Sequence, residues 1–130
     1  MSRLSGLDST ALQGSWQQVA LEVDGVPNPP EDLSPPGAVT SFHDNHFAVR
    51  TAEGTLLLEG SFTLDEAADP KAITWTDTMG PDAGKQLAAI YTLDGDAFTF
   101  IAADAGAPRP TDFRGGPGKT MRSFVRRPSR

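Results

Sequence analysis

Leu12-Gln13-Gly14-Ser15-Trp16 stands between a short helical pattern and a long series of strand patterns. Gly14 permits unusual dihedral angles and a close neighbour at the start of a strand. Trp16 is a side chain that hides roughly 150–250 Å² when buried and then needs a partner for its indole N–H. Asp8 or Ser9 can cap the helical turn upstream. We therefore expect a β-barrel to begin here, plugged at one end by the turn and Trp16. An ordinary strand start with a core tryptophan is the alternative.

Alternating apolar and polar residues predict strands along the rest of the chain. In the clearest example, residues 55–64, one parity carries Leu56, Leu58, Gly60, Phe62 and Leu64, and Gly60 suits a sharp bend. Asp94-Gly95 is typical of a tight hairpin turn. We expect an all-β fold, an eight-stranded antiparallel up-and-down barrel with a short N-terminal helical turn. The expected strands cover residues 14–24 (with a bulge near 17–18), 38–42, 46–51, 55–64, 72–78, 86–93, 98–102 and 119–126.

Two long loops interrupt this pattern. Residues 27–37 are dense in proline, which lacks the N–H that a β-ladder needs. We expect this loop to lie over one open end of the barrel, where such loops commonly act as lids. Residues 104–118, rich in glycine and proline, form the second loop.

Length and composition limit the class of protein. The 130 residues indicate one domain, residues 1–130, with 1–6 and 127–130 frayed. Because there is no cysteine, disulfides and thiolate metal sites are excluded. No signal peptide or membrane span is evident, so we expect a soluble, cytoplasmic protein. The net charge is −6, with +6 from residue 109 onward and −12 before it. The acidic body argues against nucleic-acid binding.

The helical turn, the Gly14-Ser15-Trp16 strand start and the meander resemble the lipocalin and calycin pattern. That resemblance implies that Trp16 and Gly14 form a barrel plug, with a basic residue of the last strand, Arg122 or Arg126, packed over the indole ring as a cation–π partner. We choose Arg122. The chain is shorter than a typical lipocalin, and the remaining lipocalin motifs are not evident.

The chain also resembles a family of uncharacterised bacterial domains that is abundant in planctomycetes. Its recurring pieces appear in order along nearly the whole chain, and they imply a lipocalin-like fold without implying an activity. These pieces are Leu12-Gln13-Gly14-Ser15-Trp16, Glu22-Val23-Asp24-Gly25, Gly60-Ser61-Phe62-Thr63-Leu64-Asp65, Ile90-Tyr91-Thr92-Leu93-Asp94-Gly95-Asp96 and Arg109-Pro110-Thr111-Asp112-Phe113.

The inward parity collects aromatic residues, which line either a filled core or an apolar pocket. Tyr91 supplies the one inward hydroxyl of this set, and Arg109 in the second loop can grip a ligand carboxylate or anchor the loop. The candidate ligand-binding residues are Tyr91, Trp75, Phe47, Phe62, Phe98, Phe100 and Arg109; Leu56, Leu58, Ile73, Leu87 and Met121 are also placed inward.

Other patterns favour structure over chemistry. His43-Asp44-Asn45-His46 has two histidines, but a hairpin turn explains it better than a metal site. Asp94 and Asp96 fit hairpin chemistry better than calcium binding. No nucleophile–base pair is visible, so we expect no catalytic residue, metal or cofactor.

Three functions remain open at this stage. The leading hypothesis is a lipocalin-like barrel, monomeric or homodimeric, that binds a small apolar or amphipathic molecule. The second is a filled barrel that acts as a protein-interaction module. The third is a barrel cyclase or isomerase, which requires Tyr91 or an inward carboxylate in a cavity.

Overall fold

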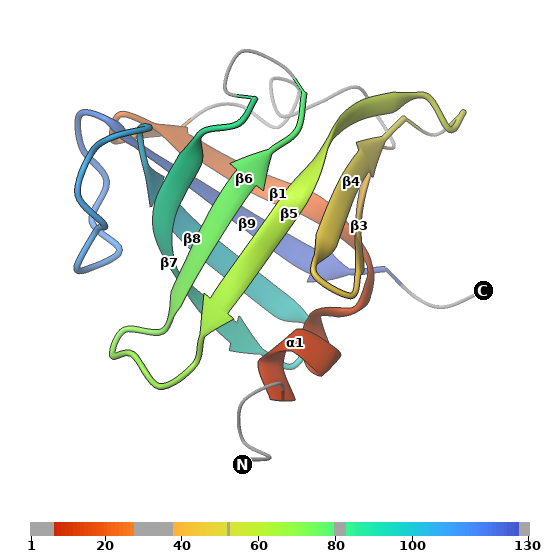
Figure 1. The fold of residues 1–130 in the computed structure, drawn as a ribbon, viewed down its shortest axis with the longest axis horizontal. Helices are drawn as coiled ribbons and strands as arrows, with labels where there is room; N and C mark the ends of the chain where they lie inside the picture. The colour runs from red at the N-terminus through yellow and green to blue at the C-terminus, as the bar shows by residue number, and fades with distance from the viewer. Residues whose placement is uncertain (1–6, 28–37, 52, 80–82, 128–130) are drawn as a thin grey trace.

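The structure is a computed structural model that describes residues 7–27, 38–51, 53–79 and 83–127. One short helix precedes a series of antiparallel strands, as the sequence predicts (Figure 1). The expected proline-rich lid lies almost wholly outside the described residues, as do residues 1–6 and 128–130. The elements are α1 (Leu7–Leu12), β1 (Gly14–Val23), β2 (Val26–Pro27), β3 (Val39–His43), β4 (His46–Arg50), β5 (Leu56–Asp65), β6 (Ala72–Asp77), β7 (Gln86–Asp94), β8 (Ala97–Ala103) and β9 (Lys119–Arg126).

Eight of these strands form a closed antiparallel barrel, which confirms the predicted fold class. The sheet runs from β1 through β3 to β9, and β1 pairs again with β9. β2 is a two-residue strand that pairs with the last residues of β1 and lies outside the barrel closure. The expected bulge is present in β1, where the register with β9 shifts between Gln18 and Ala20. Because of this shift, Trp16 and Leu21 are both buried although their parities differ.

The interior of the barrel is rich in aromatic side chains on the predicted inward parity. Phe98 is fully buried and contacts Trp16, Tyr91 and Phe124, with ring centroids 5.8–6.0 Å apart. At Gly60 a Cβ would lie 2.2 Å from the carbonyl oxygen of Thr76, so the close approach of β5 to β6 requires glycine there.

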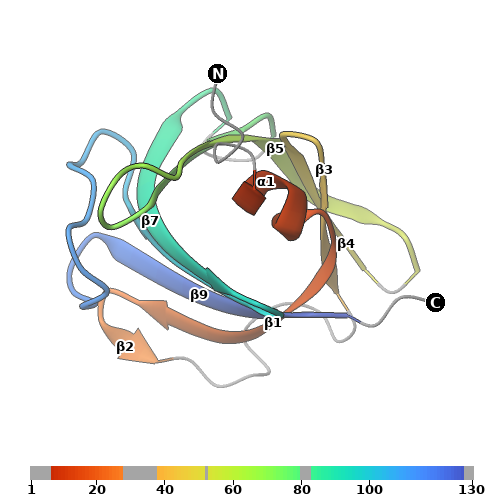
Figure 2. The ribbon, with the colours of Figure 1, turned by 90° about the horizontal axis from the view of Figure 1, so that it is seen from below.

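Helix α1 closes one end of the barrel (Figure 2). The indole Nε1 of Trp16 donates a hydrogen bond to the carbonyl oxygen of Leu12, 2.8 Å away. The guanidinium of Arg126 lies 4.3 Å from the centroid of the Trp16 ring, and its Nη1 donates to the Gln13 carbonyl oxygen at 2.8 Å. Gly14 has a φ of 113°, and a Cβ there would lie 3.3 Å from Arg126 Nη1. We call this end, made by α1, Trp16 and Arg126, the closed end.

The assignment of Met121 to the interior is wrong. On β9 the side chains of Arg122 and Phe124 face inward, whereas Val125, on the parity of Met121, is 41% exposed. Met121 pairs with Ile101, which pairs with Ile90. Ile90 and Ile101 alternate with inward residues and are nonetheless almost completely buried. The barrel thus has a second, smaller apolar cluster on its outer face. Figure 1 shows the 104–118 loop outside the barrel wall near these strands.

Candidate ligand-binding cavity

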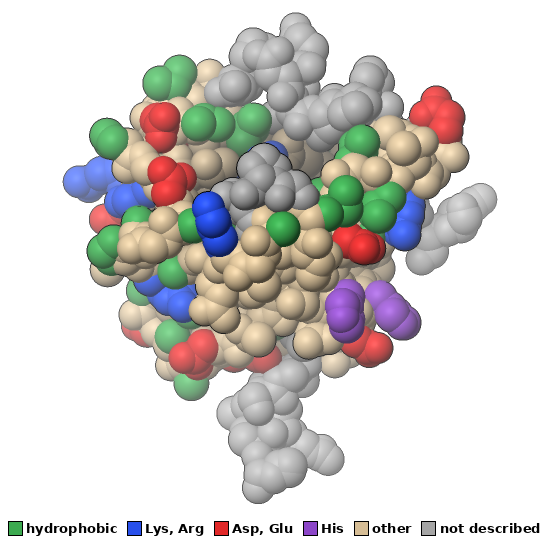
Figure 3. All heavy atoms as spheres, turned by 45° about the horizontal axis from the view of Figure 1, so that its top comes forward, with side chains coloured by type: hydrophobic (Ala, Val, Ile, Leu, Met, Phe, Trp, Pro, Cys, Tyr) green, Lys and Arg blue, Asp and Glu red, His purple; other side chains and the backbone are tan. Residues whose placement is uncertain are grey.

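A cavity of about 510 Å³ occupies the end of the barrel opposite α1. Its walls come from the upper parts of β3 to β9, and Gln18 of β1 completes the lining. We call this the open end; Figure 3 is turned toward it and shows hydrophobic side chains beside charged ones on this face. A small barrel of eight strands has room for one small ligand at most.

Aromatic rings form most of the apolar wall of the cavity. Trp75 is central: its ring centroid lies 4.8 Å from that of Phe100 and 5.3 Å from that of Phe47. Phe42 and Phe124 extend the wall toward the closed end. These rings come from five strands. Phe47 meets Trp75 edge to face, Phe42 and Phe100 are tilted against Trp75, and Phe124 stacks on Phe100.

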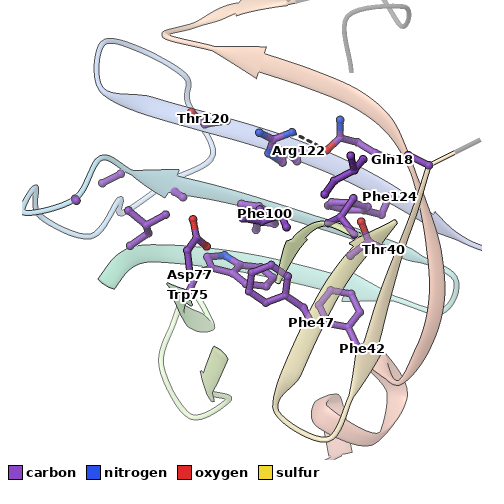
Figure 4. A pocket seen from close by; sticks show the side chains of 18 of the residues that line it. Gln18, Thr40, Phe42, Phe47, Trp75, Asp77, Phe100, Thr120, Arg122 and Phe124 are labelled. Atoms are coloured by element: carbon purple, nitrogen blue, oxygen red, sulfur yellow. Dashed lines mark hydrogen bonds between the residues drawn. The ribbon is translucent and has the colours of Figure 1, made fainter. Parts of the chain in front are cut away.

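Polar groups interrupt this wall on two sides (Figure 4). On one side Arg122 Nη1 donates to Gln18 Oε1 at 2.8 Å. On the other, Asp77 lies two residues after Trp75 on the same face of β6. Two buried donors, Gln18 Nε2 and Trp75 Nε1, have no hydrogen-bond partner among the described residues. A buried donor without a partner costs about 1–3 kcal/mol, so the cavity favours an occupant with acceptor atoms.

The charges that face the cavity are of both signs. Burial lowers the pKa of Arg122, and the negative charge of Asp77 opposes this shift. The guanidinium of an arginine keeps its positive charge in proteins. Asp104, which is exposed, adds a second carboxylate to the lining. From the described residues, the cavity therefore carries one buried positive charge and two carboxylates.

Three of the residues predicted to bind a ligand line this cavity: Phe47, Trp75 and Phe100. Phe62 and Phe98 lie in the packed core and do not line it. Their strands run the full height of the barrel, and both residues lie nearer the closed end. Parity along a strand indicates which face a residue occupies but gives no height along the barrel axis.

Tyr91 lies at the closed end, away from the cavity. It is 2% exposed, and its hydroxyl donates to Asp8 Oδ2 at 2.7 Å. The same carboxylate oxygen accepts from Lys71 Nζ at 2.9 Å, and the backbone N–H of Asp8 donates to Glu66 Oε1 at 3.2 Å. Burial, aided by the Asp8 hydrogen bond and nearby carboxylates, raises the pKa of the Tyr91 phenol well above its ordinary value. Tyr91 therefore ties α1 to the barrel wall.

Arg109 anchors its loop and does not line the cavity. Its Nη1 donates to the carbonyl oxygens of Ile73 and Ala89, at 3.0 and 2.7 Å, and its Nη2 donates to Thr74 Oγ1 at 2.8 Å. Of the two roles that the sequence left open, the geometry matches loop anchoring.

The two arginines named for the barrel plug occupy different places. Arg126 pairs with Trp16 in the ladder and covers its ring, whereas Arg122 lies four residues earlier on β9. Four residues of strand span about 13 Å, which moves Arg122 from the closed end into the cavity. The choice of Arg122 as plug is therefore corrected to Arg126, whose guanidinium also donates to the carbonyl oxygens of Ala11 and Gln13 at the C-terminal end of α1.

Sequence reasoning missed Gln18 and Asp77 as cavity residues. Each follows a tryptophan by two positions on the same strand, so each shares the parity of a buried ring. That spacing was a usable signal. Polar residues of a strand are ordinarily assigned to its solvent face, so Gln18 and Asp77 were not expected inside the barrel.

The residues described here hold no cluster of three or more potential metal ligands. His43 and His46 pair across the β3–β4 hairpin, whose turn includes Asp44 at a φ of 56°. Within the described ranges, no helix is long and apolar enough to span a membrane. Comparisons with protein-family models, with curated proteins and with solved structures find no match to this chain.

Proposed function

We propose that this chain is a lipocalin-like binding protein that takes up a small, largely apolar molecule in its open-ended barrel. The observation that carries the proposal is the cavity of about 510 Å³ at the end opposite α1. Pockets for small molecules commonly measure about 300–1,000 Å³ and combine an apolar wall with a few polar groups. This cavity has both features.

The construction of the barrel supports binding at the open end. Trp16, Leu12 and Phe98 are each no more than 1% exposed, so the closed end is filled by side chains. The open end is lined partly by small residues, Ala102 and Ala105 among them. A molecule that enters there meets the rings of Trp75 and Phe100 and buries apolar surface against them, which is the main source of binding free energy.

A titration with the uncharged fluorescent probe N-phenyl-1-naphthylamine tests this proposal. Ala102 lies on β8 and lines the cavity, so Ala102→Leu fills part of it. Ala97 lies on the same strand and is exposed, so Ala97→Leu is the matched control. We expect Ala102→Leu to weaken probe binding by about tenfold or more, equivalent to about 1.4 kcal/mol, while Ala97→Leu leaves it unchanged.

Native mass spectrometry of the purified protein, beside a denatured control, shows whether a molecule co-purifies in the barrel. A bound mass that disappears on denaturation supports the proposal. Equal probe affinity in the two leucine variants would place binding outside the cavity and contradict it.

A further inference from the structure

We propose that the cavity binds an uncharged carbonyl compound with an apolar body more tightly than the corresponding carboxylate. Trp75 donates a hydrogen bond to the carbonyl oxygen, and the negative charge of Asp77 repels the anion. This inference rests on the proposed function and names the chemical class of its ligand. Any carbonyl oxygen that offers its lone pairs next to the aromatic wall has this chemistry, in an amide or in a ketone.

The first observation behind this inference is that the indole N–H of Trp75 lacks a hydrogen-bond acceptor among the described residues. Trp75 is 6% exposed, and its Nε1 is buried without a hydrogen-bond partner among the described residues. By contrast, Nε1 of Trp16 donates to a backbone carbonyl oxygen 2.8 Å away. A buried indole N–H usually has a partner. The ring of Trp75 faces the cavity, so an acceptor on the occupant supplies the missing one.

A second donor lies on the opposite wall. Gln18 uses its Oε1 to accept from Arg122, which fixes the amide so that its Nε2 is directed away from the guanidinium. Nε2 is also buried without a partner in the described part of the chain. Both unpartnered atoms are uncharged donors, and a carbonyl oxygen satisfies such a donor at lower desolvation cost than a carboxylate.

The charges around these donors disfavour an anion. Asp77 lies beside Trp75 on β6, so a carboxylate accepting from Trp75 Nε1 would sit next to another carboxylate. Among the described residues that line the cavity, Arg122 is the basic one, and it already faces Gln18 and the negative charge of Asp77. Asp104 at the cavity and the net charge of −6 on the whole chain add to the repulsion. An uncharged acceptor avoids all of these costs.

Decanamide and decanoate form a matched pair of probes with the same apolar chain, used below micelle-forming concentrations at about pH 8, where the acid is ionised. The readout is the 15N–1H signal of each indole N–H, assigned with Trp75→Phe. We expect decanamide to bind about tenfold or more tightly than decanoate, and to move the Trp75 signal downfield while the Trp16 signal stays in place.

Two variants test the hydrogen bond from Trp75 and the negative charge of Asp77 separately. Trp75→Phe keeps an aromatic ring but removes the N–H, and should weaken decanamide binding by about tenfold. Asp77→Asn removes the negative charge, and should strengthen decanoate binding by about tenfold while leaving decanamide within about twofold. Thermal melts of both variants establish that each remains folded.

The outcomes distinguish this inference from the function on which it rests. Decanoate binding as tightly as decanamide, or decanamide binding with an unmoved Trp75 signal, overturns the inference and leaves a binding barrel. Unchanged decanoate affinity in Asp77→Asn overturns the role of that residue. Failure of both probes and of N-phenyl-1-naphthylamine to bind overturns the inference and the proposed function together.

Discussion

At the residue scale, Trp16 holds three elements together at the closed end. Its side chain is fully buried, its Nε1 donates to the last residue of α1, and Arg126 of β9 covers its ring. We expect Trp16→Ala to lower the free energy of unfolding by about 3–5 kcal/mol, because it leaves a large cavity and an uncovered guanidinium. Urea denaturation followed by circular dichroism measures this loss. A loss below about 1 kcal/mol would contradict the role of Trp16 as the plug.

Tyr91 gives a second prediction at this scale, on pH. Burial and the Asp8 hydrogen bond raise the pKa of its phenol in the folded state, so the folded protein binds this proton more tightly than the unfolded chain. The contribution is fully present below the ordinary pKa of about 10 and is lost as the pH rises above it, by up to about 1.4 kcal/mol per pH unit.

This chain has one tyrosine, so tyrosinate absorbance at alkaline pH reports Tyr91 alone. We expect no tyrosinate in the folded protein near pH 10, at about the ordinary pKa of the phenol, and its appearance only with unfolding. Tyr91→Phe should remove this part of the alkaline loss of stability, while the contributions of lysines remain. Ordinary titration of the phenol in the folded protein would contradict the burial of its hydroxyl.

At the element scale, Gly60 sets how closely β5 approaches β6. A Cβ at this position would lie 2.2 Å from a carbonyl oxygen of β6 and 2.8 Å from the ring of Phe47. Gly60→Ala should therefore lower the free energy of unfolding by about 1–3 kcal/mol, the usual cost of overpacking. Gly116→Ala is the matched control, because a Cβ there has no atom within 4 Å. Equal stability of the two variants in chemical denaturation would show that the strands can separate without cost.

The 104–118 loop depends on Arg109 in the same way. Its guanidinium donates to carbonyl oxygens of β6 and β7, which no shorter side chain reaches with the same geometry. We expect Arg109→Ala to cost about 1.5–3 kcal/mol of stability and to speed amide exchange at Ile90, which lines a hollow together with Arg109. The exposed Arg114 of the same loop serves as the control through Arg114→Ala. Unchanged amide exchange at Ile90 would contradict a role of Arg109 in covering the outer apolar cluster.

The elements were more predictable than the cavity. Alternation along each strand predicted eight strands close to their observed bounds, because one face of each strand packs inside the barrel. The same alternation failed on β9, where Met121 was placed inside and Arg122 at the plug. β9 carries apolar side chains on both parities, Met121 and Val125 on one and Phe124 on the other, so hydrophobicity alone does not show which parity faces the interior. Height along the barrel, which separates Arg122 from Arg126, depends on register and is not encoded in any one strand.

At the scale of the whole molecule, the two ends of the barrel differ: one is packed with side chains and the other holds a cavity. The closed end is packed with Leu12, Trp16 and Phe98, and supplies the stability of the fold. The open end keeps a cavity in which two donors lack partners among the described residues. Unfilled apolar space and unpartnered donors both lower stability, so this end is maintained at a cost that a ligand would offset.

This division predicts opposite effects of one substitution on stability and on binding. Ala102→Leu fills part of the cavity and should raise the free energy of unfolding by about 1 kcal/mol, since each newly buried methylene contributes about 0.8 kcal/mol less some strain. The exposed Ala97→Leu on the same strand should change it by less than about 0.5 kcal/mol. Chemical denaturation of both variants without ligand measures the difference.

The stabilised variant should also lose ligand binding, because the same space cannot hold both a leucine side chain and a bound molecule. Saturating ligand stabilises the parent chain by mass action, by about 2.7 kcal/mol at a hundredfold excess over Kd, and should stabilise Ala102→Leu much less. If Ala102→Leu destabilises the chain and still binds ligand, the space beside Ala102 is closed in the free protein, and the binding site lies elsewhere on the barrel.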